Sequence, residues 1–277
     1  MMPVFTHLLT LGASLAAMTA AIPAVAGGQS TATVDRSMVD SAQPPRSEMA
    51  ALPFGVGEQL NYMVAVGGAR VGTGRMEVLG IEDVRGEDTF HAKFTVEGGF
   101  LMFKVNDVLE SWFDTETLYS RRFIQKIKEV NYKKDRYFEI YPERSVLHQR
   151  GYEELPSVSQ PLDDASFLYF VRTVPLEVGK TYTFNRYFRP DRNPVIVKVI
   201  RKEKITVPAG TFNTVVIQPI IKSQGIFAEG GEAHMWLTDD KRHMMVQFKA
   251  KVPYLKTLDL YLQSYRAATA TTPGNTP

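Results

Sequence analysis

The chain has 277 residues, of which 44% are hydrophobic and 22% charged, a composition typical of a globular protein long enough to bury a sizeable core. It contains no cysteine, which excludes disulfides, thiolate metal sites, thiol catalysis and a lipid-modified N-terminal cysteine. Thirty-two basic against 30 acidic residues give a net charge of +2, which provides no protein-wide field for nucleic acid.

Residues 1–26 have the pattern of a secretory signal peptide. No charged residue precedes Asp35, an apolar region runs from Leu8 to Ile22, and Ala24-Val25-Ala26 has the small side chains of a cleavage site. The apolar region is shorter than the roughly 20 residues that a membrane span needs. We therefore expect export to the periplasm, a mature chain that starts at Gly27, and no transmembrane span in it.

Three regions follow the signal peptide. Residues 27–51 and 267–277 are rich in small and polar residues without apolar periodicity, which predicts a flexible linker and a disordered tail. Between them, 52–266 predicts a single β-rich domain. Its short runs of β-branched and aromatic residues alternate with polar ones, and about eleven such runs are separated by turn residues. The pattern predicts an all-β, mainly antiparallel fold, a large curved sheet or half-open β-barrel.

The glycine-rich stretch 64–78 predicts a β-hairpin and not a phosphate-binding loop. Gly67-Gly68 lies between two alternating apolar runs, as in a two-residue turn that requires positive φ. The spacings of a P-loop and of a dinucleotide-binding loop are both missing. Gly72 and Gly74 share one face of the second strand, where the lack of side chains permits sharp curvature or close approach of a helix.

One segment departs from the strand pattern. Residues 163–173 begin with Asp163 or Asp164 as a cap, carry apolar side chains at helical spacing and stop before Pro175, which predicts one helix of about three turns. A lone amphipathic helix beside a curved sheet is expected to cover its concave face, since each has an apolar surface to bury.

The run from Phe100 to Phe103 places large apolar side chains on both faces of a strand, which indicates either covered core or an apolar pocket. Together with the glycines and the helix, this run predicts a candidate groove for an apolar ligand. Its residues are Gly72, Gly74, Phe100, Phe103, Phe167, Leu168, Phe170 and Val171.

The sequence contains no motif for catalysis, a cofactor or a metal. Ser166 lacks the G-x-S-x-G context of a hydrolase nucleophile. His234 and His243 flank Asp239-Asp240 without metal-ligand spacing, and the aspartate pair before two basic residues is typical of a hairpin turn. We expect a protein that is not an enzyme and that needs no cofactor.

Two basic stretches, 121–136 and 186–204, each carry a net charge of about +5. On paired strands they would form a stripe that meets anionic headgroups or lipopolysaccharide phosphates. If they instead face solvent as ordinary surface charges, they would prevent other strands from pairing with the edges of the sheet. Nucleic acid is not expected, because an exported protein seldom meets it and the aromatic residues show no stacking-platform spacing.

Several motifs, taken in order, resemble a family of exported bacterial proteins known as domain of unknown function 3108, over most of residues 53–266. The matching residues are Gly57, Glu58, Leu60 and Tyr62, then Asp163, Ser166, Leu168, Tyr169 and Arg172, then Val207–Phe212 and Trp236–Asp240. Met245-Val246 departs from the Pro-Val common in such sequences. The family brings no established activity and looks like periplasmic half-barrel proteins such as the lipoprotein-localisation carriers, an analogy of fold alone.

These observations predict a periplasmic half-barrel that binds a lipid or another apolar ligand. The alternative is an envelope structural or interaction protein that docks a partner, with peripheral membrane contact, through a sheet edge or the basic stripe. A hydrolytic enzyme is the third and least supported reading.

Overall fold

The computed structural model describes residues 52–100, 103–129, 132–221, 232–252 and 256–269. The signal peptide, the linker and the tail from residue 270 onward lie outside the described residues and stay predictions. No helix in the described ranges is long and apolar enough to cross a membrane.

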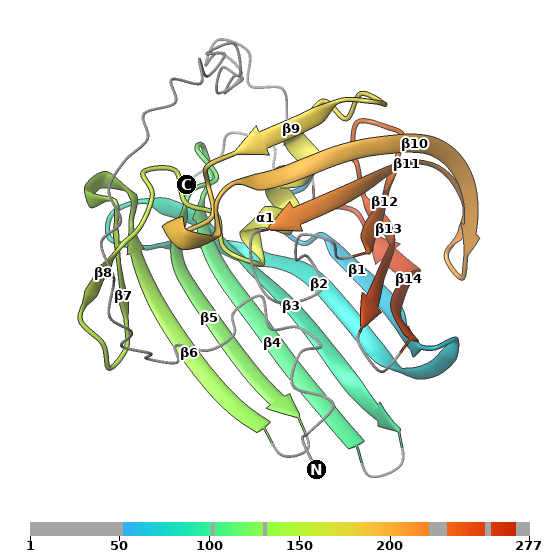
Figure 1. Cartoon of the computed structure of the whole chain (residues 1–277), viewed down its shortest axis with the longest axis horizontal. Coiled ribbons are helices and arrows are strands. Elements are labelled where there is room, and N and C mark those ends of the chain that lie inside the picture. Colours follow the sequence, from blue (N-terminus) through green and yellow to red (C-terminus); the bar gives the residue numbers. More distant parts are fainter. Residues whose placement is uncertain (1–51, 101–102, 130–131, 222–231, 253–255, 270–277) are drawn as a thin grey trace, which may run out of the picture.

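One antiparallel sheet of 14 strands dominates the described chain, in the order β8-β7-β6-β5-β4-β3-β2-β1-β14-β13-β12-β11-β10-β9. Figure 1 shows the sheet curled around the short helix α1, which lies between β2–β6 and β9–β12. The end strands β8 and β9 have one neighbour each, so the sheet does not close. The predicted all-β, half-open architecture is confirmed.

The strands range in length from 3 to 15 residues. Their bounds are Gln59–Val66 (β1), Ala69–Asp83 (β2), Asp88–Phe100 (β3), Phe103–Asp114 (β4), Ser120–Glu129 (β5), Tyr132–Tyr141 (β6), Val146–Gln149 (β7), Glu154–Pro156 (β8), Thr181–Phe184 (β9), Val195–Val207 (β10), Gly210–Ile221 (β11), Ala233–Thr238 (β12), Met245–Val252 (β13) and Lys256–Arg266 (β14).

The predicted hairpin at the first glycine pair is confirmed. Gly67 and Gly68 connect β1 to β2 with φ angles of 57° and 87°. Both values lie in the left-handed region, where a Cβ atom is unfavourable. The glycines therefore form the turn, and a strand rather than a helix follows them.

The predicted helix is present but shorter than expected. α1 spans Ser166–Phe170 and is followed by a 3₁₀ turn, η2, at Val171–Thr173. Asp163 caps it, since its Oδ1 accepts the backbone N–H groups of Ala165 and Ser166 at 2.8 and 2.9 Å. The helix lies on the concave face, where Tyr169 contacts the rings of Phe54 and Phe113.

Strands β1–β6 and β9–β14 trace the same antiparallel meander, one after the other along the sheet. In the first copy, Thr89 on β3 is paired with Glu82 on β2 and donates its hydroxyl to the Glu82 carbonyl at 2.6 Å. Trp112 on β4 donates its indole N–H to the Glu82 carboxylate at 2.7 Å. Glu82, Thr89 and Trp112 thus form one hydrogen-bonded group across β2, β3 and β4.

The second copy repeats this arrangement. Thr214 on β11 is paired with Glu203 on β10 and donates to its carbonyl at 2.7 Å, and Trp236 on β12 donates to the Glu203 carboxylate at 2.6 Å. The strand register shifts at the same two places in both copies, just before the glutamate and directly after the tryptophan. The described fold thus contains an internal structural repeat, which our reading of the sequence missed.

Gly72 marks a close approach of two strands. A Cβ atom there would lie 2.2 Å from the carbonyl oxygen of Glu97 and 2.8 Å from the Cα of Gly98. Gly72 and Gly98 are directly opposite each other on β2 and β3. The close neighbour of Gly72 is therefore the β3 backbone and not the helix that the sequence led us to consider.

Gly72→Ala should destabilise the protein by about 1–3 kcal/mol, because backbone atoms cannot give way as a flexible side chain can. Gly80→Ala is the matched control, since a Cβ atom at Gly80 on the same strand meets no heavy atom within 4 Å. Urea unfolding measures both variants. Equal free energies of unfolding would contradict the close approach.

Candidate functional site

Arg172 fixes the helix to two other parts of the chain. Its Nη1 and Nη2 donate to the two carboxylate oxygens of Glu58 at 2.6 and 2.9 Å, and the arginine side chain is fully buried. Nη2 also donates to the carbonyl of Pro53 at 2.7 Å, and Nε donates to the carbonyl of Arg242 at 3.1 Å. One guanidinium thus joins the helix, the segment before β1 and the β12–β13 turn.

Asp163 provides the second anchor. Its Oδ2 accepts the hydroxyl of Ser111 on β4 at 2.5 Å, and its backbone N–H donates to the hydroxyls of Ser120 and Ser166, each at 2.9 Å. The two latter hydroxyls lie 2.8 Å apart. Burial raises the pKa of Asp163. This buried cluster holds the start of the helix against β4 and β5.

Asp164 lies between buried cationic groups. The Tyr187 hydroxyl donates to Asp164 Oδ1 at 2.6 Å. Burial raises the pKa of Asp164 to about 7, although Arg192 of the 3₁₀ turn η3 (Pro190–Arg192) and Arg136 of β6 both act electrostatically to lower it. Arg136 also donates to Gln125 Oε1 on β5 at 2.8 Å. The neighbouring Asp163 raises the pKa of Asp164 further.

Several buried side chains of the described residues keep unused hydrogen-bonding capacity. Within the described chain, Gln125 Nε2, Arg192 Nη1 and Asp107 Oδ2 have no hydrogen-bond partner. Burial raises the pKa of Asp107 to about 6. Buried polar atoms without a partner are rare in native proteins and cost about 1–3 kcal/mol each. The contacts within the described fold therefore do not account for these polar atoms.

The concave face beside the helix, which we call the floor, is buried and includes polar side chains on β4, β5 and β6. Ser111 bonds to the helix segment, so the residues two and four positions before it on β4 face the same side. Strand pairing aligns one row as Met76, Phe94, Leu109, Gln125 and Arg136. The next row contains Gly74, Val96 and Asp107, continued on β5 and β6 by Ile127 and Lys134.

The predicted groove residues on the strands lie on β2 and at the β3–β4 tip. Gly74 is on the floor, where a Cβ atom would be in ordinary contact with Tyr62 and Val64 at 3.5 and 3.6 Å. Gly72 lies against β3, as described above. Phe100 and Phe103 pair at the β3–β4 tip, but their side chains lie outside the described part.

The helical members of the predicted groove face the core. Phe167, Phe170 and Val171 are buried, and Leu168 is half-buried. The Phe170 ring packs edge-on against Phe184 of β9 with the centroids 5.0 Å apart. These side chains therefore cover the β9 side of the interior, away from Gly74 on β2.

The two basic stretches do not form one stripe on paired strands, because β5 and β6 lie far from β9 and β10 in the sheet order. Arg122 lies over the Trp112 ring at 5.5 Å, whereas Arg136 faces the floor. Arg192, from the second stretch, and Arg136 both act electrostatically to lower the pKa of Asp164. Sequence reasoning missed Gln125 and the electrostatic action of both arginines on Asp164. Gln125 could have been found as a polar residue on the apolar face of a strand, between Phe123 and Ile127.

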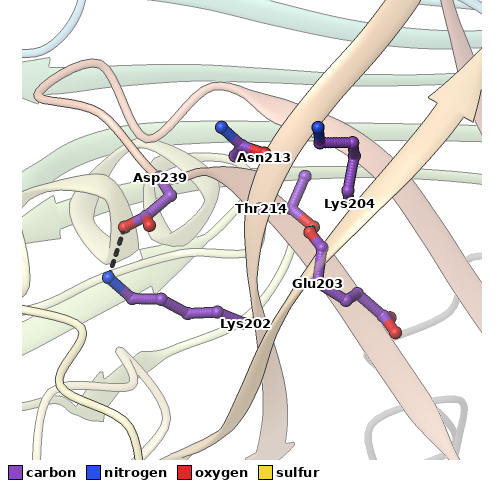
Figure 2. A pocket seen from close by; sticks show the side chains of 6 residues that line it. All are labelled: Lys202, Glu203, Lys204, Asn213, Thr214 and Asp239. Carbon is purple, nitrogen blue, oxygen red and sulfur yellow. Dashed lines mark hydrogen bonds and ion pairs between the residues drawn. The ribbon is translucent and has the colours of Figure 1, made fainter.

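A shallow surface pocket lies on the other arm of the sheet and is polar (Figure 2). Its volume is about 220 Å³, and Lys202 and Asp239 form an ion pair across it at 2.8 Å. Glu203, which also lines it, already binds Arg201 and Trp236. The described residues contain no group of three or more histidines, aspartates and glutamates arranged to hold a metal ion.

The raised pKa of Asp164 makes stability depend on pH. A carboxyl whose pKa rises from 3.8 to about 7 on folding stabilises the native state at low pH, and this contribution is lost as the pH rises from about 4 to 8. We expect a loss of up to about 4 kcal/mol, at 1.4 kcal/mol per pKa unit. Urea unfolding at pH 4.5, 6 and 8 measures it.

Asp164→Asn should flatten this pH dependence, since the amide keeps the oxygen that binds Tyr187 and cannot ionise. Asp135→Asn, at an exposed aspartate on β6, is the matched control and should follow the wild type. If the free energies of unfolding of the wild type and of Asp164→Asn changed with pH in parallel, the raised pKa of Asp164 would be contradicted.

A crystal structure of a β-barrel-like protein of domain of unknown function DUF1849 from Brucella abortus matches with a TM-score of 0.52 and 11% identity, over 78% of this chain and 99% of that one. At that identity the match shows the fold alone. A protein from Parabacteroides distasonis provisionally described as a lipoprotein matches with a TM-score of 0.35 and 11% identity, over 78% and 98% of the two chains.

The comparison with curated proteins yields no match. The family model for a protein of unknown function, DUF3108, matches residues 61–263, which contain α1, the Asp163 cluster and the floor. The resemblance read from the motifs is confirmed: the chain belongs to the DUF3108 family.

Proposed function

We propose that this protein is a non-enzymatic, extracytoplasmic binding protein that holds an amphiphilic, lipid-like ligand on the floor of β2–β6. The observation that carries the proposal is one row of the floor, which changes from apolar side chains on β2–β4 to Gln125 and Arg136 on β5 and β6. Ligand sites are commonly apolar surfaces with few polar groups that fix orientation. The signal-peptide pattern of residues 1–26 supports the compartment.

The helix forms a fixed wall of this site. Arg172 and Asp163 hold its two ends through buried hydrogen bonds, and breaking a buried ion pair costs about 3–5 kcal/mol. A lid would need weaker and more exposed contacts. A ligand chain would therefore leave α1 in place and would have to separate Phe94, Leu109 and Val96, which are 6%, 2% and 4% exposed, from the side chains that cover them.

Docking through a sheet edge has less support. The edge strands β8 and β9 contain 3 and 4 residues, and β8 ends in Pro156, which has no backbone N–H to donate. Short edges with proline are typical of proteins that avoid pairing with another strand. Both edges therefore offer few backbone groups to a partner.

Gly74→Leu should weaken binding of a neutral pyrene-labelled long-chain alcohol at least about tenfold, because the new side chain extends over the floor from a Cβ atom that is itself tolerated. Fluorescence titration of the full mature chain, freed of endogenous lipid in denaturant and refolded, measures the affinity.

Gly80→Leu adds the same side chain to the same strand at a position with no heavy atom within 4 Å of the Cβ, and should bind like the wild type. Circular dichroism and thermal unfolding check that both variants fold. The proposal fails if the wild type shows no saturable binding, or if folded Gly74→Leu binds as tightly as Gly80→Leu.

A further inference from the structure

We propose that the floor contains a site for a hydroxyl group, in which Asp107 accepts a hydrogen bond from the hydroxyl and Gln125 donates its amide N–H to the hydroxyl oxygen. The inference rests on the proposed function and adds the chemistry of the headgroup, which is that of a neutral long-chain alcohol or acylglycerol. Two buried atoms without a partner, the strand register and the internal repeat each support it.

The first observation is a buried carboxylate oxygen without a partner. Asp107 on β4 is 1% exposed, and its Oδ1 accepts the backbone N–H of Lys128 on β5 at 3.1 Å. This bond uses one carboxylate oxygen and leaves Oδ2, which has no hydrogen-bond partner among the described residues. Because native proteins rarely leave a buried acceptor unpaired, Oδ2 indicates a donor that the described contacts do not supply.

The second observation is a buried donor on the neighbouring strand. Arg136 on β6 donates to Gln125 Oε1 at 2.8 Å, so the carbonyl oxygen of the Gln125 amide is used. Its Nε2 has no acceptor within the described chain, although the side chain is only 1% exposed. The contact with Arg136 therefore explains one end of this amide and leaves the nitrogen unexplained.

Strand pairing places these two unused groups next to each other. Leu109 and Gln125 are directly opposite on β4 and β5, and Asp107 lies two positions before Leu109, on the same face. Asp107 and Gln125 are therefore diagonal neighbours, which lie about 7–8 Å apart along the backbone and within reach of a long side chain. One oxygen atom that bonds to both groups spans about 5–6 Å, which fits two groups that do not bond to each other directly.

A free acceptor beside a free donor selects the chemistry of the ligand group. A hydroxyl has one hydrogen to donate to Asp107 Oδ2 and lone pairs that accept from Gln125 Nε2. An ether or a carboxylate ligand has no hydrogen for Oδ2, and an ammonium has no lone pair for the amide N–H. The side chains beside them in the two rows, Val96, Phe94 and Leu109, are apolar, as the alkyl chain of such a ligand requires.

The internal repeat shows that the meander does not need an amide at this position. The residue before each tryptophan pairs with a phenylalanine, Phe123 in the first copy and Phe248 in the second. Two positions further along the strand, the first copy has Gln125 and the second has Ala250, and both are buried. Strand packing alone therefore accepts an apolar side chain where the first copy has a donor, and a bound hydroxyl explains the difference.

The test compares a pyrene-labelled long-chain alcohol with its methyl ether, which has the same chain but no hydroxyl hydrogen. Fluorescence titration uses the full mature chain, freed of endogenous lipid in denaturant and refolded. The titration is done at pH 8, where Asp107 is ionised because burial raises its pKa only to about 6. We expect the wild type to bind the alcohol at least about tenfold more tightly than the ether, since the ether leaves a buried acceptor unpaired.

Asp107→Asn should abolish the preference for the alcohol with almost no change in shape. The amide oxygen can still accept the N–H of Lys128, and the amide nitrogen replaces Oδ2 with a donor that the oxygen of either probe can accept. Asp135→Asn, at an exposed aspartate on β6, is the matched control and should keep the preference of the wild type. Circular dichroism and thermal unfolding check that both variants fold.

Gln125→Glu tests the donor. The new carboxylate keeps an oxygen for Arg136 and replaces the free N–H with a second acceptor, which the lone pairs of the hydroxyl oxygen cannot bond. We expect its affinity for the alcohol to fall at least about tenfold. An unchanged alcohol affinity in the folded variant would contradict the role of Gln125 and overturn the site.

The outcomes separate this inference from the proposed function. A preference for the alcohol that Asp107→Asn abolishes supports both. Equal binding of alcohol and ether by the wild type, or a preference that persists in folded Asp107→Asn, overturns the hydroxyl site and leaves the proposed function, with a bound water only between the two side chains. Tighter binding of the matching pyrene-labelled fatty acid than of the alcohol also overturns the hydroxyl site alone. If the wild type binds none of the three probes, both proposals fail.

Discussion

The buried ion pair between Arg172 and Glu58 is the interaction on which the rest of the structure depends. Because the guanidinium also reaches the carbonyls of Pro53 and Arg242, it ties together segments that are distant in sequence. Tyr62 reinforces this link by donating its hydroxyl to the Met245 carbonyl across the interior at 3.0 Å. The helix position, and with it one wall of the floor, follows from these contacts.

Local signals in the sequence predicted the local features of the fold. The alternation of apolar residues predicted the strands, and Gly67-Gly68 predicted the hairpin because a positive φ at both positions has few other solutions. The Asp163 cap was also predictable. The helix length was not, because the apolar spacing continues through a 3₁₀ turn that buried contacts of Arg172 stabilise.

The candidate site depends on strand pairing, which the sequence does not display. Gln125 and Arg136 are 11 residues apart and meet across β5 and β6. The repeat was hidden for a similar reason. Its glutamate and tryptophan are 30 residues apart in one copy and 33 in the other, and the residues around them differ. Only the shared bonds and register shifts identify it.

The place of β14 in the sheet has a consequence for how the chain acquires its fold. This strand is the last in the sequence, yet it lies between β1 and β13, near the middle of the sheet. Synthesis runs from the N-terminus, so β1 keeps an unpaired backbone edge until the final strand has been made. Such pairing between the two ends of a chain is slow to form. A chaperone that shields β1 in this interval would protect the nascent protein from aggregation.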